Sequence, residues 1–207
     1  MFYRRIDDHL ALKLFNVYDA AEIFDLIERD RDHLSEFLPW VGSIRSVEDE
    51  RASLKLLGVF DPDQQVNCSL TRDDRIIGAV GLPMVNREAD WGEIGYWISR
   101  SEQGKGYVTA AVREVERLAF LDIGLDRVQI TCDIDNIRSS AIPRRLGYTM
   151  EGILRHHLVS GGFRIADRAV YSLLRGEWEA REAPAVATGV DLTSEPPAVL
   201  GVESSTG

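Results

Sequence analysis

The chain has few residues of the kinds that hold metals or form disulfides. Its 207 residues include two cysteines and four histidines. Cys68 and Cys132 each lie in an alternating apolar segment, a pattern typical of buried thiols rather than of a disulfide or a metal ligand. We therefore expect no bound metal.

Long hydrophobic runs are also missing. No stretch of about 18 consecutive apolar residues occurs, so we expect no membrane-spanning helix and no membrane partner. The first residues, MFYRRIDDHLALKLF, carry acids among the apolar side chains and offer no apolar core of a signal peptide. We expect a cytoplasmic protein.

The chain has fewer basic than acidic residues. The chain holds 24 Lys and Arg against 34 Asp and Glu, a formal net charge of −10. Binding to nucleic acid needs a basic face, so we expect no nucleic-acid partner. The acidic balance is compatible with a cationic partner such as an amine, although solubility is the more common reason for a charge of this size.

The charge is unevenly distributed, and this suggests a domain boundary. After Arg181 no Lys or Arg occurs, and the remaining segment is rich in Ala, Pro, Ser and Thr. Such a segment buries too little apolar surface to offset its ordering entropy. We predict one domain over residues 1–181 and a flexible acidic tail over residues 182–207, with a docking peptide as the less favoured interpretation.

Strand and helix periods alternate within the predicted domain. Ser46 is an expected N-cap, with Asp49 in the first turn of its helix, and Asp19 is a second expected cap. The pattern predicts an α/β fold with a mixed, largely antiparallel sheet. The predicted strands are 9–15, 66–72, 76–85, 92–99, 127–135, 148–159 and 163–174, and the predicted helices are 19–29, 46–58, a long one from Gly104, and 139–146.

The long helix has a clear apolar face. Val108, Ala111, Val112 and Val115 recur at the helical period and are expected to face the core. The intervening polar residues are expected to point outward: Arg113, Glu116 and Arg117.

The turn before this helix is the most informative segment. It carries two glycines, Gly104 and Gly106, which can adopt positive φ and let a ligand approach the backbone. The first N–H groups of a helix lack internal partners and lie at the positive end of its dipole. Together these features predict an anion site suited to phosphates, with Lys105 adding charge, although a tight structural turn is the alternative. The Walker pattern is absent, and Thr109 replaces the third glycine of the dinucleotide fingerprint.

The turn resembles a known motif. Residues 103–108, QGKGYV, are similar to motif A of the GNAT N-acetyltransferases, Q/R-x-x-G-x-G/A, with Gln103 and Gly106 matching and Val108 where Gly or Ala is usual. Further segments resemble the RimL/RimJ branch, the ribosomal-protein N-terminal acetyltransferases. They are ADWGEIGYWIS at 89–99, DNIRS at 135–139, RLGYTMEG at 145–152, and the pattern at 167–178. The similarity extends over residues 1–179.

This resemblance implies a GNAT fold in which two central parallel strands, 92–99 and 127–135, splay apart. The pantetheine arm of acetyl-CoA would lie between them like an extra strand. Backbone groups of Trp97, Ile98 and Ser99 would bond it, and a bulge at these residues would aim an N–H at the thioester oxygen. Asn136 would bond the same arm or, equally well, cap the following helix. The implied cofactor-binding residues are Trp97, Ile98, Ser99, Gln103, Gly104, Lys105, Gly106, Tyr107, Val108, Thr109 and Asn136.

Ser139 matches the serine of the N-x-x-S pattern in the family, which lies near the cofactor sulfur. As a hydroxyl donor it would stabilise the leaving thiolate. Many GNAT enzymes use a tyrosine four residues before the helix-ending glycine, and Pro143 occupies that position here. The alternative for Ser139 is a hydroxyl that bonds backbone in the first turn of a helix.

The general base is less defined. Glu93 shares a strand face with Trp97 and is a candidate to accept the proton of the amine through a water, although an exposed or ion-paired strand glutamate is as consistent. In the RimL branch a glutamate on a later strand has this task. Leu158 stands at that position here, directly after His156 and His157, and a neutral histidine suits the task.

The acceptor is expected to be an amine, on a protein N-terminus or on a small molecule such as an antibiotic. Trp40, in a loop after Pro39, is the candidate to wall its pocket, although aromatic residues are more often core. A catalytically weak CoA-binding module and a structural protein are the alternatives to an acetyltransferase. Relatives of this kind suggest a homodimer.

Overall fold

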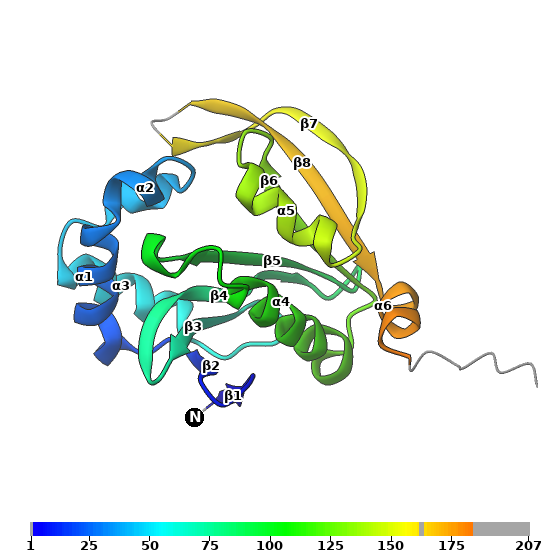
Figure 1. Ribbon diagram of the computed structural model, residues 1–207, viewed down its shortest axis with the longest axis horizontal. Helices are drawn as coiled ribbons and strands as arrows, with labels where there is room; N and C mark the ends of the chain where they lie inside the picture. The colour runs from blue at the N-terminus through cyan, green and yellow to red at the C-terminus, as the bar shows by residue number, and fades with distance from the viewer. Residues whose placement is uncertain (1, 162–163, 184–207) are drawn as a thin grey trace, which may run out of the picture.

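The computed structural model describes residues 2–161 and 164–183, so most of the predicted tail lies outside the described residues. In the described part, no helix is long and apolar enough to cross a membrane. Eight strands within residues 2–161 and 164–183 form one sheet in the order β1-β2-β3-β4-β5-β6-β8-β7 (Figure 1). The strands are β1 (Tyr3–Arg5), β2 (Leu10–Leu14), β3 (Val66–Arg72), β4 (Arg75–Asn86), β5 (Trp91–Ile98), β6 (Arg127–Asp133), β7 (Thr149–Val159) and β8 (Ile165–Leu174).

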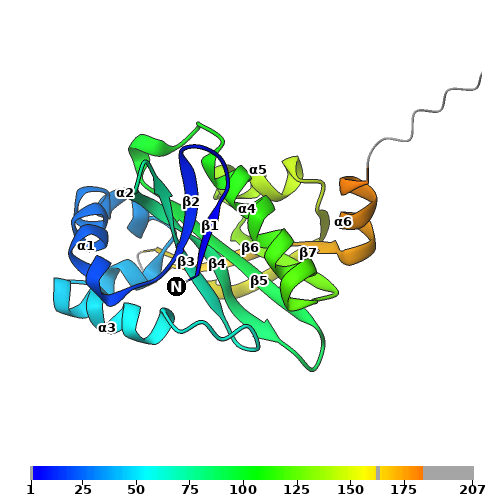
Figure 2. The same cartoon turned by 90° about the horizontal axis from the view of Figure 1, so that it is seen from below.

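Six α-helices flank this sheet in the described residues. They are α1 (Ala20–Arg29), α2 (Arg31–Ser35), α3 (Val47–Leu57), α4 (Tyr107–Arg117), α5 (Ile137–Arg145) and α6 (Arg175–Glu182). One apolar cluster packs α4 against β2 to β6 and β8, and a second lies among α1, α2 and α3. Figure 2 shows the group of α1, α2 and α3 apart from α4 and α5. The predicted α/β class with a largely antiparallel sheet is confirmed.

Of the predicted helix caps and turns, those at Ser46 and Asp73–Asp74 are present, and the cap at Asp19 is not. The Ser46 hydroxyl accepts the N–H of Asp49 at 3.1 Å, so this cap is confirmed. Asp73 and Asp74 form the turn between β3 and β4, both at positive φ, as a two-residue hairpin turn of type I′ requires. Asp19 makes no side-chain cap hydrogen bond, and its carboxylate instead pairs with Lys13 at 2.8 Å.

Three elements were not predicted: β1, α2 and α6. Each is short, with three, five and eight residues, and too brief for a period to stand out. Because α6 was not predicted, the orientation predicted for one residue of α4 was wrong. Glu116 was expected to point outward but is fully buried, because Arg181 of α6 folds over it and pairs with its carboxylate.

The only parallel pair among the described strands is β5 with β6, and it is short. Its register covers Trp91 to Glu93 on β5 and Arg127 to Gln129 on β6. Beyond Glu93 the two strands no longer pair, while β6 continues alongside β8 as far as Asp133. The predicted splaying of two central parallel strands is therefore confirmed.

A register irregularity lies next to this divergence, on the other side of β5. Gly81 pairs with Gly95 and Met84 pairs with Glu93, so two residues of β4 face one residue of β5. The extra residue is thus on β4, at Leu82–Pro83, and not on β5 where a bulge was expected. A proline that lacks an N–H is tolerated at such a bulge.

Candidate active site

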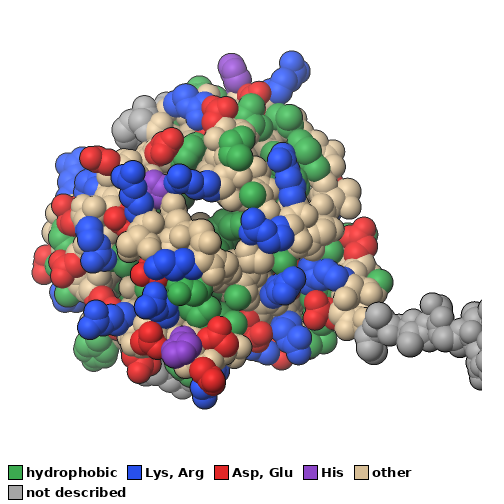
Figure 3. All heavy atoms as spheres, in the orientation of Figure 1, with side chains coloured by type: hydrophobic (Ala, Val, Ile, Leu, Met, Phe, Trp, Pro, Cys, Tyr) green, Lys and Arg blue, Asp and Glu red, His purple; other side chains and the backbone are tan. Residues whose placement is uncertain are grey.

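A cleft of 1260 Å³ opens where β5 leaves β6. Its walls come from β5, the start of α4, α5 and the end of α2. Figure 3 shows a hollow near the middle of this face, with Lys and Arg side chains around it. The cleft brings together ten of the residues predicted from sequence: Trp97, Ile98, Gln103, Gly104, Gly106, Tyr107, Val108, Thr109, Asn136 and Ser139.

The start of α4 has the geometry of an anion site. Gly104 and Gly106 adopt φ of 75° and 84°, and no atom lies within 4 Å of where a Cβ would stand on either. The N–H of Ala110 donates to Gly106 O at 3.0 Å as the helix begins. Among the described residues, the N–H groups of Tyr107, Val108 and Thr109 before it have no acceptor. Three free amides at the positive end of a helix dipole can bind a phosphate.

Ser99 does not line the cleft. Its hydroxyl donates to Asp30 Oδ2 at 2.6 Å and its N–H donates to Ile77 O at 2.8 Å. Asp30 also accepts the N–H of Arg100 at 2.7 Å. The buried Asp30 therefore holds the end of β5 and the start of the glycine turn, and Ser99 has no N–H left to offer a ligand.

Lys105 also lies outside the lining of the cleft. Its ammonium pairs with Glu102 Oε2 at 3.0 Å, and Arg72 reaches the same oxygen at 2.9 Å. Both cations also lie near the Tyr107 ring, about 6 Å from its centroid. Lys105 thus contributes positive charge near the turn while its ammonium is held by Glu102.

Ser139 and Asn136 meet at the first turn of α5. Asn136 Oδ1 accepts the N–H of Ser139 at 3.0 Å, so Asn136 caps the helix. The Ser139 hydroxyl donates to Tyr96 Oη at 3.3 Å, and Tyr96 Oη donates to Ser139 O at 3.0 Å. Sequence reasoning missed Tyr96, because no local pattern links it to Ser139, which lies 43 residues later in the chain.

Glu93 lies at the last paired rung of β5 and β6, outside the cleft lining. One carboxylate oxygen accepts the hydroxyl of Thr131 at 2.6 Å and the other accepts the amide of Gln129 at 3.2 Å. His156 and His157 are exposed on β7. The N–H of His156, at φ 50°, donates to Asp167 Oδ1 at 2.9 Å within a bulge of that strand.

Sequence reasoning also missed a set of arginines around the cleft. Arg145 donates to the Thr109 hydroxyl at 3.1 Å, and Arg138 donates to Gln103 Oε1 at 3.0 Å. The amide nitrogen of Gln103 lies 2.5 Å from a ring nitrogen of His33. This acidic chain therefore gathers cations where the free amides of α4 lie. The lining arginines are Arg100, Arg113, Arg138 and Arg145.

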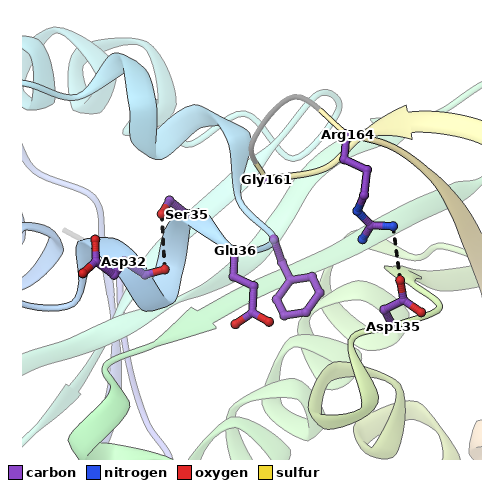
Figure 4. Close-up of a pocket in the computed structure, with 7 residues that line it drawn as sticks. Asp32, Ser35, Glu36, Asp135, Gly161 and Arg164 are labelled. Carbon is purple, nitrogen blue, oxygen red and sulfur yellow. Dashed lines mark hydrogen bonds and ion pairs between the residues drawn. The ribbon is translucent and has the colours of Figure 1, made fainter.

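A second pocket of 640 Å³ shares Glu36, Phe37 and Asp135 with the cleft lining. Figure 4 shows Glu36 on the α2 side and Arg164 reaching from the β8 side to Asp135. Arg164 pairs with Asp135 at 3.1 Å and with Asp133 at 2.7 Å. Within residues 2–161 and 164–183, no group of His, Cys, Asp or Glu is arranged to hold a metal.

Trp40 lines neither pocket, and its ring packs on Trp97. The two ring centroids are 6.0 Å apart, and Trp40 is 37% exposed. Trp40 therefore touches the strand that forms one wall of the cleft, from outside the cleft itself.

A sheet split between two parallel strands, with the free amides of a helix terminus at the split, fits the architecture of acyltransferases that use nucleotide-linked thioesters. The family model "Acetyltransferase (GNAT) domain" matches residues 9–149. The chain belongs to the GNAT acetyltransferases, and it is an acyltransferase with acetyl-CoA as its co-substrate.

Relatives and solved structures agree with this family. YdaF of Bacillus subtilis (strain 168), provisionally named a ribosomal N-acetyltransferase, is 32% identical over 188 residues, 86% of this chain and 98% of YdaF. The ribosomal-protein-serine acetyltransferase of Escherichia coli (strain K12) is 24% identical over 73% of this chain and 85% of its own length. RimL, the ribosomal L7/L12 alpha-N-protein acetyltransferase solved with coenzyme A, superposes with a TM-score of 0.80 at 19% identity, covering 85% of this chain and 99% of RimL. The predicted resemblance to the RimL/RimJ branch is confirmed.

Proposed function

We propose that the protein transfers the acetyl group of acetyl-CoA to the α-amino group of a protein N-terminus. The observation that carries acetyl-CoA binding is the set of free amides at the start of α4, at the mouth of the split between β5 and β6. The names of the ribosomal-protein relatives support a protein acceptor. An antibiotic or another small-molecule amine is the competing acceptor.

The residues of the cleft suit the charge and shape of acetyl-CoA. The amides of Tyr107, Val108 and Thr109 would bind its diphosphate, with Arg138 and Arg145 adding charge nearby. The pantetheine arm would lie along β5 at Trp97 and Ile98, where β6 has turned away. The amide nitrogen of Asn136 is the further donor for this arm, since its oxygen caps α5.

The chemistry needs a neutral amine, a polarised thioester carbonyl and a stabilised leaving group. The amine nitrogen forms the new bond to the carbonyl carbon, the carbon–sulfur bond breaks, and the sulfur leaves as a thiolate that takes up a proton. Ser139 would donate a hydrogen bond to that sulfur. Glu93 would accept the amine proton through a water, because each of its carboxylate oxygens has a second lone pair beyond the bond it accepts.

The second pocket is the proposed entry of the acceptor. Asp32 and Glu36 line it with carboxylates that would attract an amine before it loses its proton, whereas Asp135 is paired with Arg164. Phe37 lines both this pocket and the main cleft and would contribute apolar surface to the acceptor, while Trp40 would support Trp97 from behind the wall of the main cleft.

Calorimetry with acetyl-CoA, followed by turnover on synthetic peptides, tests this function. We expect binding, and acetylation of peptides that begin with serine or alanine but not of the same peptides with a blocked N-terminus. An aminoglycoside and a polyamine are the small-molecule comparisons. Turnover on these alone would overturn the protein acceptor. Binding without turnover on any amine would favour a non-catalytic CoA-binding module.

We further propose that the protein acts in the cytoplasm, where ribosomal proteins are made, and as a homodimer. The support for a dimer is β7, which ends the sheet and exposes Met150, Ile153 and Leu154 by 42% to 50%. Light scattering on the purified protein tests the dimer, and a monomer at micromolar concentration would rule it out.

A further inference from the structure

Tyr96 lies in the wedge between the diverging strands. It follows the last rung of the parallel pair, Glu93, by three residues. Its ring packs against the main apolar cluster, whereas the neighbouring Trp97 packs against the cluster of α1, α2 and α3. Tyr96 and Ser139 both line the cleft, so a phenol and an alcohol meet where the proposed pantetheine path ends.

Pro143 explains why Tyr96 is needed at this point. In an α-helix the carbonyl of Ser139 would accept the N–H of residue 143, and proline has no N–H. The Tyr96 hydroxyl donates to this carbonyl instead, at 3.0 Å. A hydroxyl from β5 thus takes the place of the N–H that Pro143 lacks.

The side-chain hydroxyl and the main-chain carbonyl of Ser139 both form a hydrogen bond with the Tyr96 hydroxyl. Its hydroxyl donates to Tyr96 Oη at 3.3 Å while its carbonyl accepts from the same oxygen. Asn136 holds the remaining N–H. Burial raises the pKa of Tyr96, so the phenol keeps its proton and remains a donor at ordinary pH.

We propose that Tyr96 is a positioning residue for Ser139: it takes the place of the missing helical donor and orients the serine hydroxyl toward the sulfur of CoA. This proposal rests on the proposed function. As negative charge develops on the sulfur, the Ser139 proton turns from Tyr96 to the sulfur. Tyr96 keeps its bond to the Ser139 carbonyl and so holds the first turn of α5 in place. No proton is transferred to or from Tyr96.

Steady-state kinetics with acetyl-CoA and a peptide with N-terminal serine provide the first test. We expect Tyr96→Phe to lower kcat by roughly 3- to 10-fold, the value of one hydrogen bond, with the KM for acetyl-CoA little changed. In a Ser139→Ala background the same change should have no further effect, since Tyr96 acts through that hydroxyl. The control is Tyr148→Phe, which removes a buried phenol outside the cleft lining and should keep wild-type kcat. Additive losses from Tyr96→Phe and Ser139→Ala would overturn the proposal.

A proline substitution separates positioning from stability. In the Tyr96→Phe background, Pro143→Ala restores a helical N–H for the Ser139 carbonyl but not a partner for its hydroxyl. We expect the unfolding midpoint to recover and kcat to stay low. Recovery of both would show that Tyr96 only stabilises α5, and would overturn the proposal.

One readout needs no acceptor. The thiol of bound CoA should titrate at a lower pH than free CoA, measured by thiolate absorbance, because a hydroxyl donor favours the thiolate. Tyr96→Phe and Ser139→Ala should both raise this thiol pKa. If wild type acetylates no peptide while this pattern holds, the proposed function fails and the positioning role stands. If Tyr96→Phe leaves the thiol pKa unchanged while Ser139→Ala raises it, the positioning role fails.

Discussion

The carboxylate of Glu116, fully buried in α4, accepts a hydrogen bond from the guanidinium of Arg181 in α6. The same guanidinium donates to Leu146 O at 2.7 Å, so one side chain joins three segments of the chain. The second oxygen of Glu116 has no hydrogen-bond partner among the described residues. Burial raises the pKa of Glu116, against the effect of Arg181. Arg181 opposes this rise in pKa, so α6 favours the charged form of Glu116.

Arg181→Ala should destabilise the fold strongly. It leaves a buried carboxylate without its partner, which costs about 3 to 5 kcal/mol of unfolding free energy. Urea unfolding measures the loss, and the control is Arg117→Ala, a 49% exposed side chain expected to cost under about 1 kcal/mol. Adding Glu116→Leu to Arg181→Ala should recover much of the stability. Equal small losses in both single variants would contradict the role of Arg181.

The pairing of Arg181 with Glu116 ties α6 to the rest of the fold, so we propose that the domain includes this helix. The sequence suggested a domain ending at residue 181, whereas α6 ends at Glu182. We expect a chain that stops after Ala183 to keep the unfolding midpoint and acetyl-CoA affinity of the full protein. A chain that stops after Leu174 loses α6 and should unfold at lower urea. Loss of acetyl-CoA affinity in the chain that stops after Ala183 would show that residues 184–207 take part in binding.

Gly106→Ala should weaken acetyl-CoA binding by about 10-fold, because it strains an αL backbone at the proposed diphosphate site. The matched control is Gly124→Ala. Gly124 has φ 85° and no atom within 4 Å of a Cβ, as Gly106 does at φ 84°, but it does not line the cleft. Both variants should lose similar stability, and only Gly106→Ala should lose affinity by calorimetry. A similar loss of affinity in both would indicate a general effect on folding.

Sequence alone predicted the parts of this site that are local in the chain. The glycine turn needs positive φ at Gly104 and Gly106, and those requirements are visible within six residues. The relation of Ser139 to Tyr96 was not visible, because 43 residues separate them. The sequence shows that Pro143 stands where many GNAT enzymes have a tyrosine. Only the structure shows which group donates to the Ser139 carbonyl in place of the N–H that proline lacks. Nor does any local period reveal that Glu116 is covered by a helix 65 residues later.

The convergence of arginines on the cleft could not be predicted from the sequence either. Arg113, Arg138 and Arg145 look like ordinary exposed helix residues in the sequence, and net charge conceals their convergence. Arg145→Gln should weaken acetyl-CoA binding by roughly 5- to 10-fold, the value of one charge-assisted contact, and the deficit should shrink as salt is raised. Arg51→Gln, on α3 and 51% exposed, is the control and should bind as wild type does. An equal deficit at all salt concentrations would argue against a phosphate contact at Arg145.

Glu50 in α3 gives the protein a pH dependence that is separate from catalysis. Its side chain is buried, with the residue 5% exposed, and burial raises its pKa from 4.5 to about 7. Because the folded state binds this proton more tightly than the unfolded state, the contribution of Glu50 to stability is fully present below about pH 4.5 and is lost as pH rises toward 7. The group should therefore cost roughly 2 to 3 kcal/mol of unfolding free energy between about pH 5 and pH 8. Glu50→Gln removes the titration, so its stability relative to wild type should rise by that amount over the same range. Glu48→Gln, at a side chain 77% exposed, is the control and should show no such trend. A constant difference between Glu50→Gln and wild type from pH 5 to pH 8 would mean that Glu50 is ionised throughout, with its charge solvated despite burial.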